Sequence, residues 1–291
     1  MSRQRLTLRL LAADVPKAEA LLTLAGAETL SLRDAADDPV FEPEPSTAPL
    51  WPNVTVEALF PSGASAAPLL EILNATFPDA HAALEDVEDS AWQARLPQPV
   101  AARAIGTRLW LAPADDANVP KDRRIVRINM GLAFGTGEHP TTALCLDWLE
   151  AHVAAGMTLL DYGCGSGILA LAALKLGARF AYAVDNDPQA LIATAANAAL
   201  NDATASLFVG APELLPPAAV DVLAANILAG PLVELAPTFA ERLAPGGLLV
   251  LSGILVPQAE RVAAAYAPYV HEIAQAERDG WVCLTGRRNA G

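Results

Sequence analysis

The chain is poor in cysteine and histidine, and each scarcity argues against a class of protein. Its 291 residues include only three cysteines, Cys145, Cys164 and Cys283, which are far apart and form no Cys-x-x-Cys pair. This spacing argues against a disulfide framework and a zinc site, and it fits a reducing cytoplasm. The four histidines are scattered as well, so we expect no bound metal.

Long apolar runs are also missing. No stretch of 18 or more apolar residues escapes interruption by charge or proline, so the sequence predicts no transmembrane span. The first ten residues lack the uninterrupted apolar core of a signal peptide. We therefore expect a cytoplasmic protein that does not bind membranes.

Positive charge is scarce, and the net charge is −14. No block of Lys and Arg is present to neutralise phosphates, which argues against direct nucleic-acid binding. The negative charge favours a basic partner by electrostatic complementarity. Solubility alone accounts for the same charge equally well.

What the chain does have is a glycine-rich stretch at 161–167, Asp-Tyr-Gly-Cys-Gly-Ser-Gly, between an apolar run and an Ala/Leu-rich helical run. Glycine accepts positive φ and carries no Cβ, so a ligand can approach the backbone of such a strand-to-helix turn. The glycines Gly163, Gly165 and Gly167 read G-x-G-x-G, one residue shorter than the dinucleotide fingerprint. With Asp161 two positions before the first glycine, the stretch resembles motif I of Rossmann-like S-adenosylmethionine methyltransferases.

A second acidic residue, Asp185, ends the predicted strand at 179–184 and lies 22 residues beyond Gly163. At this distance an acidic residue meets a ribose diol, and a carboxylate accepts hydrogen bonds from two neighbouring hydroxyls. The same residue would serve NAD, so the glycine spacing discriminates between the cofactors and Asp185 does not. The alternative is that 185–188 is only a turn and helix cap, with Asp187 as N-cap and Pro188 at N1.

The first part of the chain alternates between strand and helix patterns. We predict strands at 6–10, 28–32, 54–60 and 82–87, and helices at 15–24 and 66–76. This order predicts a ferredoxin-like α+β domain over residues 1–88. Pro97 and Pro99 discourage a continuous helix in a connector at 89–108.

The remainder, 109–291, is predicted to be one α/β domain with a mostly parallel, doubly wound sheet, because strands and helices alternate. A helix at 231–243 and a final antiparallel pair, at 269–274 and 282–286, belong to this prediction. Asp161, Asp185 and Asn226 each end a predicted strand, so they would meet at one edge of the sheet, where such folds bind ligands. Asparagine at a strand end is also a common turn former.

A further glycine-rich segment, Gly-Leu-Ala-Phe-Gly-Thr-Gly-Glu-His-Pro-Thr-Thr at 131–142, precedes a long helix. Its glycines predict a mobile loop, and Thr142 offers a hydroxyl near the helix start. Phe134 is expected to cover the cofactor as a lid. Glu138 and His139 are either proton acceptors or residues of a capped helix start.

The segments at 131–144, 161–169 and 225–232 together resemble the ribosomal protein L-eleven methyltransferase family (PrmA). The closing Leu-Thr-Gly-Arg-Arg at 284–288 fits too, and the resemblance is densest from 109 to 288. It implies a Rossmann-like class I methyltransferase sheet behind an N-terminal ferredoxin-like substrate-recognition domain. It also implies S-adenosylmethionine as cofactor and methylation of lysine side chains and the N-terminal α-amine of a basic large-subunit ribosomal protein. The family's cofactor contacts fall on Thr142, Gly163, Asp185 and Asn226.

Two departures from the family stand out. Asn129-Met130 replaces the usual Asp-Pro before the Gly-Leu-Ala-Phe stretch, which puts in doubt a role of that acid in placing the amine or loop. The connector retains only Trp92 and Trp110 of an aromatic-rich segment, so domain swing is expected to be restricted.

Methyl transfer to nitrogen requires a neutral amine, and no residue declares itself a general base, so we expect positioning to supply most of the rate. Asn226 is expected to orient the amine. The alternatives are a class I methyltransferase acting on another protein or a small molecule, a non-catalytic binding module, and an NAD-dependent oxidoreductase. Methyltransferases of amides and exocyclic amines often have Asn-Pro-Pro-Tyr/Phe where this chain has Asn-Ile-Leu-Ala at 226–229.

Overall fold

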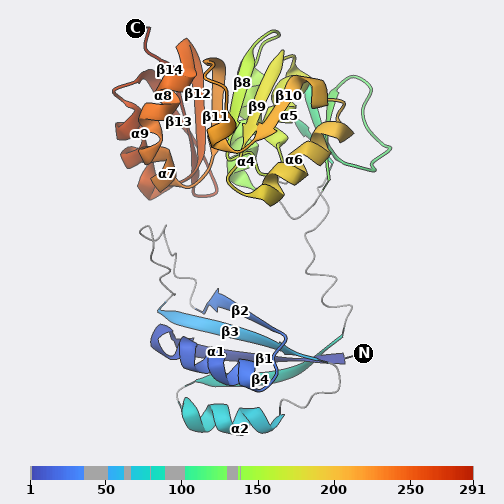
Figure 1. The fold of residues 1–291 in the computed structure, drawn as a ribbon, viewed down its shortest axis with the longest axis vertical. Helices are drawn as coiled ribbons and strands as arrows, with labels where there is room; N and C mark the ends of the chain where they lie inside the picture. Colours follow the sequence, from blue (N-terminus) through green and yellow to red (C-terminus); the bar gives the residue numbers. More distant parts are fainter. Residues whose placement is uncertain are drawn as a thin grey trace. The chain divides into compact units, whose positions relative to one another are not determined.

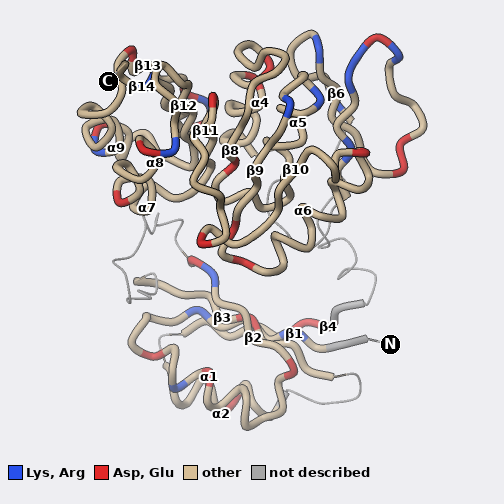
Figure 2. The backbone as a smooth tube through the Cα atoms, turned by 45° about the horizontal axis from the view of Figure 1, so that its top comes forward, with Lys and Arg blue, Asp and Glu red and all other residues tan. Residues whose placement is uncertain are grey.

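A computed structural model of the chain describes residues 2–35, 52–61, 67–78, 80–88, 102–129, 137 and 139–290. The chain forms two compact units, Met1–Gln98 and Pro99–Gly291 (Figure 1). Lys and Arg are interspersed with Asp and Glu in the described parts of both units (Figure 2).

The first unit is a four-stranded antiparallel sheet with two helices. Its elements are β1 (Ser2–Leu11), α1 (Val15–Leu24), β2 (Thr29–Asp34), β3 (Asn53–Phe60), α2 (Ala67–Thr76) and β4 (His81–Glu88). The strands lie in the order β2-β3-β1-β4, and every neighbouring pair is antiparallel. This is the ferredoxin-like arrangement that the order of elements predicted.

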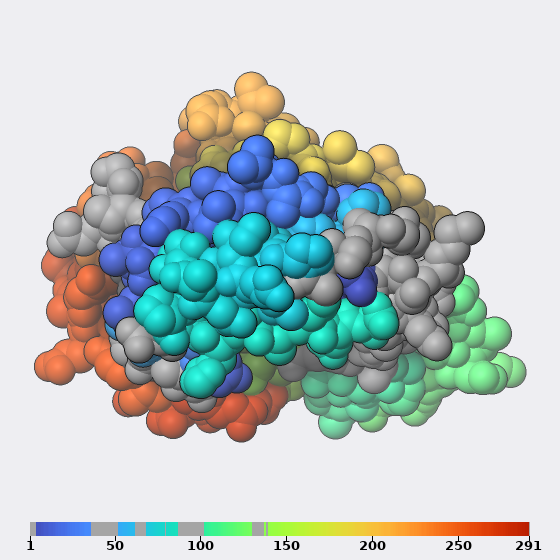
Figure 3. Space-filling model, turned by 90° about the horizontal axis from the view of Figure 1, so that it is seen from below, coloured from blue at the N-terminus to red at the C-terminus, as the bar shows by residue number. Residues whose placement is uncertain are grey.

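Strand alternation explains how this unit forms its core. Leu6, Leu8 and Leu10 of β1 are buried, as are every second residue of β3 and the inner residues Leu22 and Leu73 of the helices. The period of two directs these side chains to the helical side of the sheet. The outer side chains of α1 and α2 form the surface on that side (Figure 3).

The second unit contains a seven-stranded sheet, a three-stranded sheet and the remaining helices. Its strands are β5 (Arg103–Ile105), β6 (Leu109–Pro113), β7 (Arg124–Ile128), β8 (Thr158–Tyr162), β9 (Phe180–Val184), β10 (Leu207–Gly210), β11 (Val220–Asn226), β12 (Leu243–Leu255), β13 (Val270–Arg278) and β14 (Trp281–Arg288). Its α-helices are α4 (Pro140–His152), α5 (Ile168–Leu176), α6 (Pro188–Leu200), α7 (Ala229–Glu234), α8 (Ala236–Arg242) and α9 (Ala259–Tyr266). Short 3-10 helices occur at Ala12–Asp14 in the first unit, and at Thr204–Ser206, Pro212–Leu214 and Val256–Gln258 in the second.

The large sheet has the order β10-β9-β8-β11-β12-β14-β13. The first five strands are parallel, and β14 runs antiparallel between β12 and β13. The predicted doubly wound sheet and the final antiparallel pair are confirmed. The strand order reverses between β8 and β11, and the crevice at the carboxyl ends of these two strands is where such folds bind ligands.

Helices cover both faces of this sheet. Successive residues of β8 point to opposite sides, Leu159 into a core shared with α4 and α5, and Leu160 into a core shared with α7, α8 and α9. The three-stranded sheet of β5, β6 and β7 joins the first of these cores.

Two local predictions differ from the structure. The single helix expected at 231–243 is two helices, α7 and α8, with Leu235 between them. Pro237 explains the break, because proline lacks a backbone N–H and its ring clashes with the carbonyl four residues earlier. Arg103–Ile105, which lies inside the predicted connector, is strand β5 and pairs with β6.

Candidate functional site

The glycine-rich turn connects β8 to α5 at the point where the strand order reverses. Gly163, Gly165 and Gly167 have φ values of 76°, 53° and 77°, in the left-handed region that favours glycine. The N–H groups of Gly163 and Cys164 donate to the carbonyl of Val184 at 2.8 and 3.0 Å. The turn is therefore pinned to the end of β9.

Close packing gives a second reason for glycine here. A Cβ on Gly163 would overlap Cγ2 of Ile227, in the loop after β11, and a Cβ on Gly167 would lie 2.8 Å from Cγ2 of Thr194. Thr194, on α6, also donates through Oγ1 to the carbonyl of Gly165 at 2.9 Å. The turn thus leaves no room for side chains at these positions.

Asp185 follows β9 and faces the same turn. Its Oδ2 accepts a hydrogen bond from Gly165 N at 2.9 Å, and its Oδ1 accepts one from Asp187 N at 3.0 Å. Asp187 is the N-cap of α6, where it accepts from Gln189 N at 2.9 Å. The helix cap is therefore Asp187, and the residue predicted to bind the ribose is Asp185. Each carboxylate oxygen of Asp185 can still accept a further hydrogen bond from a hydroxyl.

Asp161 lies at the carboxyl end of β8 and is buried, with 1% of its surface exposed. Its Oδ2 accepts from Ala170 N at 3.1 Å, whereas its Oδ1 has no hydrogen-bond partner among the described residues. Burial raises the pKa of this carboxyl to about 7, and the nearby Asp185 adds to the rise, although the Ala170 N–H opposes it. A buried carboxyl with one unused oxygen suits a ligand that carries a positive charge.

A cavity of about 30 Å³ joins these residues. Its lining is made of Thr142, Asp161, Gly163, Cys164, Gly165, Ile168, Leu169 and Asn226. Five of the predicted site residues are among them. Of the others, Asp185 contacts the turn by accepting the N–H of Gly165, and Gly167 is the N-cap of α5. The volume is about that of one water molecule, so it accommodates only the tip of a ligand.

Asn226 and Thr142 close the far side of the cavity. Asn226, the last residue of β11, donates through Nδ2 to Oγ1 of Thr142 at 3.1 Å. Thr142 is buried in the first turn of α4. With its amide nitrogen engaged, Asn226 keeps its Oδ1 as an acceptor, and an incoming amine is a donor.

The predicted loop at 131–142 is only partly described. Phe134 and Glu138 lie outside the described residues, so the expected lid stays a prediction from the sequence. His139 is the N-cap of α4, where its Nδ1 accepts from Thr141 N at 3.4 Å, and its ring packs edge-on against Trp281 with centroids 4.9 Å apart. Burial lowers the pKa of His139. Of the two roles considered for it, the helix-start role is the one that these contacts support.

Sequence reasoning missed two buried polar residues of α6. Besides Thr194, Asn197 donates through Nδ2 to the carbonyl of Ser166 at 2.9 Å and accepts from Asn129 N at 2.9 Å. Both residues are at most 1% exposed. A signal was available, because Thr194 and Asn197 of α6 lie on the same face as its C-cap Asn201, and buried polar groups on such a face need partners.

The described residues give no support for a reactive thiol, a metal site or a membrane span. Burial, together with nearby Asp161, raises the pKa of Cys164 well above its usual range, so the thiol of the turn stays protonated. The described part of the chain holds no group of three or more potential metal ligands. None of its helices is long and apolar enough to cross a bilayer.

Three features together are those of a Rossmann-like class I methyltransferase: the sheet order, the G-x-G-x-G turn, which is one residue shorter than the dinucleotide fingerprint, and the acidic residues at the ends of β8 and β9. A model of the family described as ribosomal protein L11 methyltransferase (PrmA) matches residues 3–289, and the chain belongs to this family. The expected family is thereby confirmed. The protein is an enzyme that uses S-adenosylmethionine as its methyl donor.

Two curated relatives of the same name align with nearly the whole length of this chain. The ribosomal protein L11 methyltransferase of Pseudomonas fluorescens (strain Pf0-1) is 47% identical over 268 residues, which cover 90% of this chain and 91% of that protein. Its namesake in Marinobacter nauticus is 44% identical over 282 residues, with 94% of each chain covered. The crystal structure of a ribosomal protein L11 methylase from Lactobacillus delbrueckii subsp. bulgaricus superimposes with a TM-score of 0.58 at 32% identity, covering 65% of this chain and 98% of that one.

Proposed function

We propose that this chain methylates amino groups of ribosomal protein L11, namely lysine side chains and the N-terminal α-amine. The observation that carries the proposal is Asn226 in the lining of the cavity, whose Nδ2 donates to Thr142 and whose Oδ1 accepts no hydrogen bond from the described residues. An amine held by this oxygen would lie next to the methyl donor. The relatives named for this activity support the choice of substrate.

The proposed cofactor contacts are Thr142, Asp161, Gly163, Gly165, Gly167, Asp185 and Asn226. Asp185 would accept the ribose hydroxyls, and the unused Oδ1 of Asp161 would face the ammonium of the amino-acid end. The glycine turn would lie against the cofactor with bare backbone. S-adenosylmethionine supplies an electrophilic methyl group, and the residues of the chain bind and orient the two reactants.

Positioning is the main catalytic contribution in this proposal. A lysine amine has a pKa of about 10.4 and an α-amine one of about 7.7–8.0, so the nucleophile must lose a proton before attack. Cys164, which lines the cavity, keeps its proton because burial raises its pKa, so this thiol does not serve as the base. The proton passes to water or a base, and the fixed geometry supplies most of the rate.

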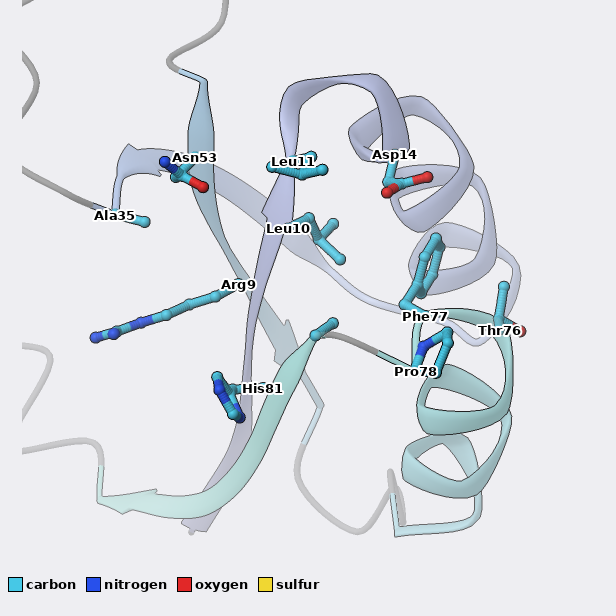
Figure 4. Close-up of a pocket in the computed structure, with 11 residues that line it drawn as sticks. Arg9, Leu10, Leu11, Asp14, Ala35, Asn53, Thr76, Phe77, Pro78 and His81 are labelled. Atoms are coloured by element: carbon cyan, nitrogen blue, oxygen red, sulfur yellow. The ribbon is translucent and has the colours of Figure 1, made fainter.

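The first unit, over about 1–88, is proposed to recognise the substrate without taking part in the chemistry, with the connector at 89–108 joining it to the catalytic domain. It contains a cavity of about 620 Å³ at one end of its sheet. Figure 4 shows Arg9 and His81, which are register partners on β1 and β4, extending away from the helices, whereas Leu10 and Phe77 lie on the helical side.

The protein is proposed to act in the cytoplasm on a basic ribosomal protein, without contacting nucleic acid or membrane. Its net charge of −14 complements such a partner. Incubating the enzyme with purified L11 and S-adenosylmethionine, followed by mass spectrometry, should show mass increases of one or more methyl groups on lysine and the α-amine. Methylation of an unrelated protein or a small molecule, with L11 unchanged, would favour the alternative class I methyltransferase.

A further inference from the structure

Arg103 connects the first strand of the second unit to the segment that leads into the site. It lies on β5, where it pairs in register with Leu111 of β6, and its side chain is half-buried. The guanidinium donates through Nη2 to the carbonyl of Gly137. Its Nε is buried without a partner among the described residues, so a single bond fixes this side chain within them.

Gly137 in turn packs on the wall of the cavity. It is buried with φ of 87°, and a Cβ placed there would lie 2.5 Å from Cδ2 of Leu111 and 3.1 Å from Cδ1 of Ile168. Ile168 is the first residue of α5 after the glycine turn, and it lines the cavity. A shift of Gly137 therefore changes the wall directly, because packed interiors transmit displacement.

The β5–β6 hairpin also holds the far end of α4. Oε1 of Glu150 accepts hydrogen bonds from the backbone N–H groups of Thr107 at 3.0 Å and Arg108 at 2.8 Å, in the turn of the hairpin. At the other end of α4, Gly137 comes shortly before Thr142, which binds Asn226. The hairpin thus fixes the helix that carries Thr142 near both of its ends.

We propose that Arg103 is a positioning residue for the cofactor site. Through Gly137 it sets the place of Ile168 and of the start of α4, so that the strand following the connector and the cavity wall move together. The inference rests on the proposed function only in taking this cavity as one part of the place where the cofactor binds.

The test compares Arg103→Ala and Arg103→Lys with a matched control, Arg123→Ala. Nη1 of Arg123 donates to two carbonyls of the same hairpin, those of Gly106 at 2.8 Å and Leu109 at 3.1 Å, but makes no bond to Gly137. Calorimetric titration with S-adenosylhomocysteine gives the affinity, and thermal unfolding gives Tm. We expect Arg103→Ala to raise Kd by up to about tenfold, because the cavity wall at Ile168 is no longer held through Gly137 and one charge-assisted hydrogen bond sets the upper scale of what can be transmitted, with partial recovery in Arg103→Lys. Arg123→Ala should lower Tm but leave Kd within about threefold of the parent.

The proposal is overturned if Arg103→Ala binds like the parent, or if Arg123→Ala loses as much affinity at equal loss of Tm. Should Arg103→Ala fail to fold, Arg103→Met decides, because methionine keeps an apolar stem but cannot donate to Gly137, and a parent-like Kd at a lowered Tm would then leave Arg103 a merely structural residue. A parent protein that binds no S-adenosylhomocysteine would instead overturn the assignment of the cofactor site. The two failures are therefore distinguishable.

Discussion

Asp161 and Asp185, at the ends of the neighbouring strands β8 and β9, hold the helix α5 and the glycine-rich turn before it, respectively. Asp185 accepts the N–H of Gly165 in the middle of the turn, and Asp161 accepts the N–H of Ala170 in the first turn of α5. The two carboxyls differ in surroundings, since Asp161 is buried and Asp185 only partly so. Their negative charges interact, and this adds to the raised pKa of Asp161. One site therefore combines a carboxyl suited to hydroxyls with one suited to a cation.

Replacing Asp185 by alanine should weaken binding of S-adenosylmethionine by about 1.5–3 kcal/mol, the scale of lost hydrogen bonds to a charged group. Calorimetric titration measures this. Asp187→Ala is the matched control, because it removes the cap of α6 and should cost about 1 kcal/mol of stability without a comparable loss of affinity. Unchanged affinity in a folded Asp185→Ala protein would remove this residue from the ribose site.

Asp161 should give the protein a stability that depends on pH. Its pKa is about 7 in the folded protein against an ordinary value of 3.8, so between these values the folded state holds a proton that the unfolded state has lost. Stability should therefore fall as pH rises from about 4 to about 7, by roughly 4 kcal/mol if this carboxyl acted alone.

The variant Asp161→Asn removes this titration. Denaturant unfolding should show a flatter pH dependence and higher stability than the parent at pH 8, because no buried charge remains. Affinity for the cofactor should drop, since the ammonium loses its counter-charge. In the parent, affinity should weaken as pH falls below about 7 because Asp161 becomes protonated. Equal pH profiles for parent and variant would contradict the role of Asp161.

Glycine is needed at position 163 for two reasons, its positive φ and the lack of space for a Cβ, and the free-energy cost of each can be measured separately. Gly163→Ala meets a φ of 76° and the side chain of Ile227. Gly156→Ala meets a φ of 86° but has nothing within 4 Å, so it should cost only the backbone term, about 1–2 kcal/mol. The excess loss of stability in Gly163→Ala, measured by denaturant unfolding, reports the clash. Equal losses would mean that Ile227 moves away freely.

The parts of the site that the sequence predicted are those encoded by neighbouring residues. The turn at 161–167 and the acid after β9 belong to short motifs, and Asn226 follows from the rule that parallel strands end at one edge. The mostly parallel, doubly wound sheet follows from the alternation of strands and helices, whereas its strand order, with the reversal between β8 and β11, comes only from the structure.

The missed parts depend on contacts between distant segments. Arg103 and Gly137 are 34 positions apart, and Asn129 and Asn197 are 68 apart, so no local pattern indicates either bond. The short strand β5 lies in the segment predicted as connector, because three residues carry too little periodicity to identify a strand. The break between α7 and α8, by contrast, has a local cause in the sequence. Pro237 disfavours a continuous helix, although the apolar pattern at 231–243 is that of a single helix.

The proposed division of labour between the two units leads to a last prediction. A fragment of residues 99–291 should bind S-adenosylmethionine like the full chain, because the described contacts of the cavity lie within that unit. It must include Arg103–Ile105, since a start near Trp110 would remove β5 together with the bond from Arg103 to Gly137. The fragment from 110 is therefore a control that should bind the cofactor more weakly.

The longer fragment, 99–291, should lose methyl transfer to L11, because the unit proposed to hold the substrate is gone. Mass spectrometry of L11 after incubation measures this, and full methylation by the 99–291 fragment would show that the first unit is not needed for recognition.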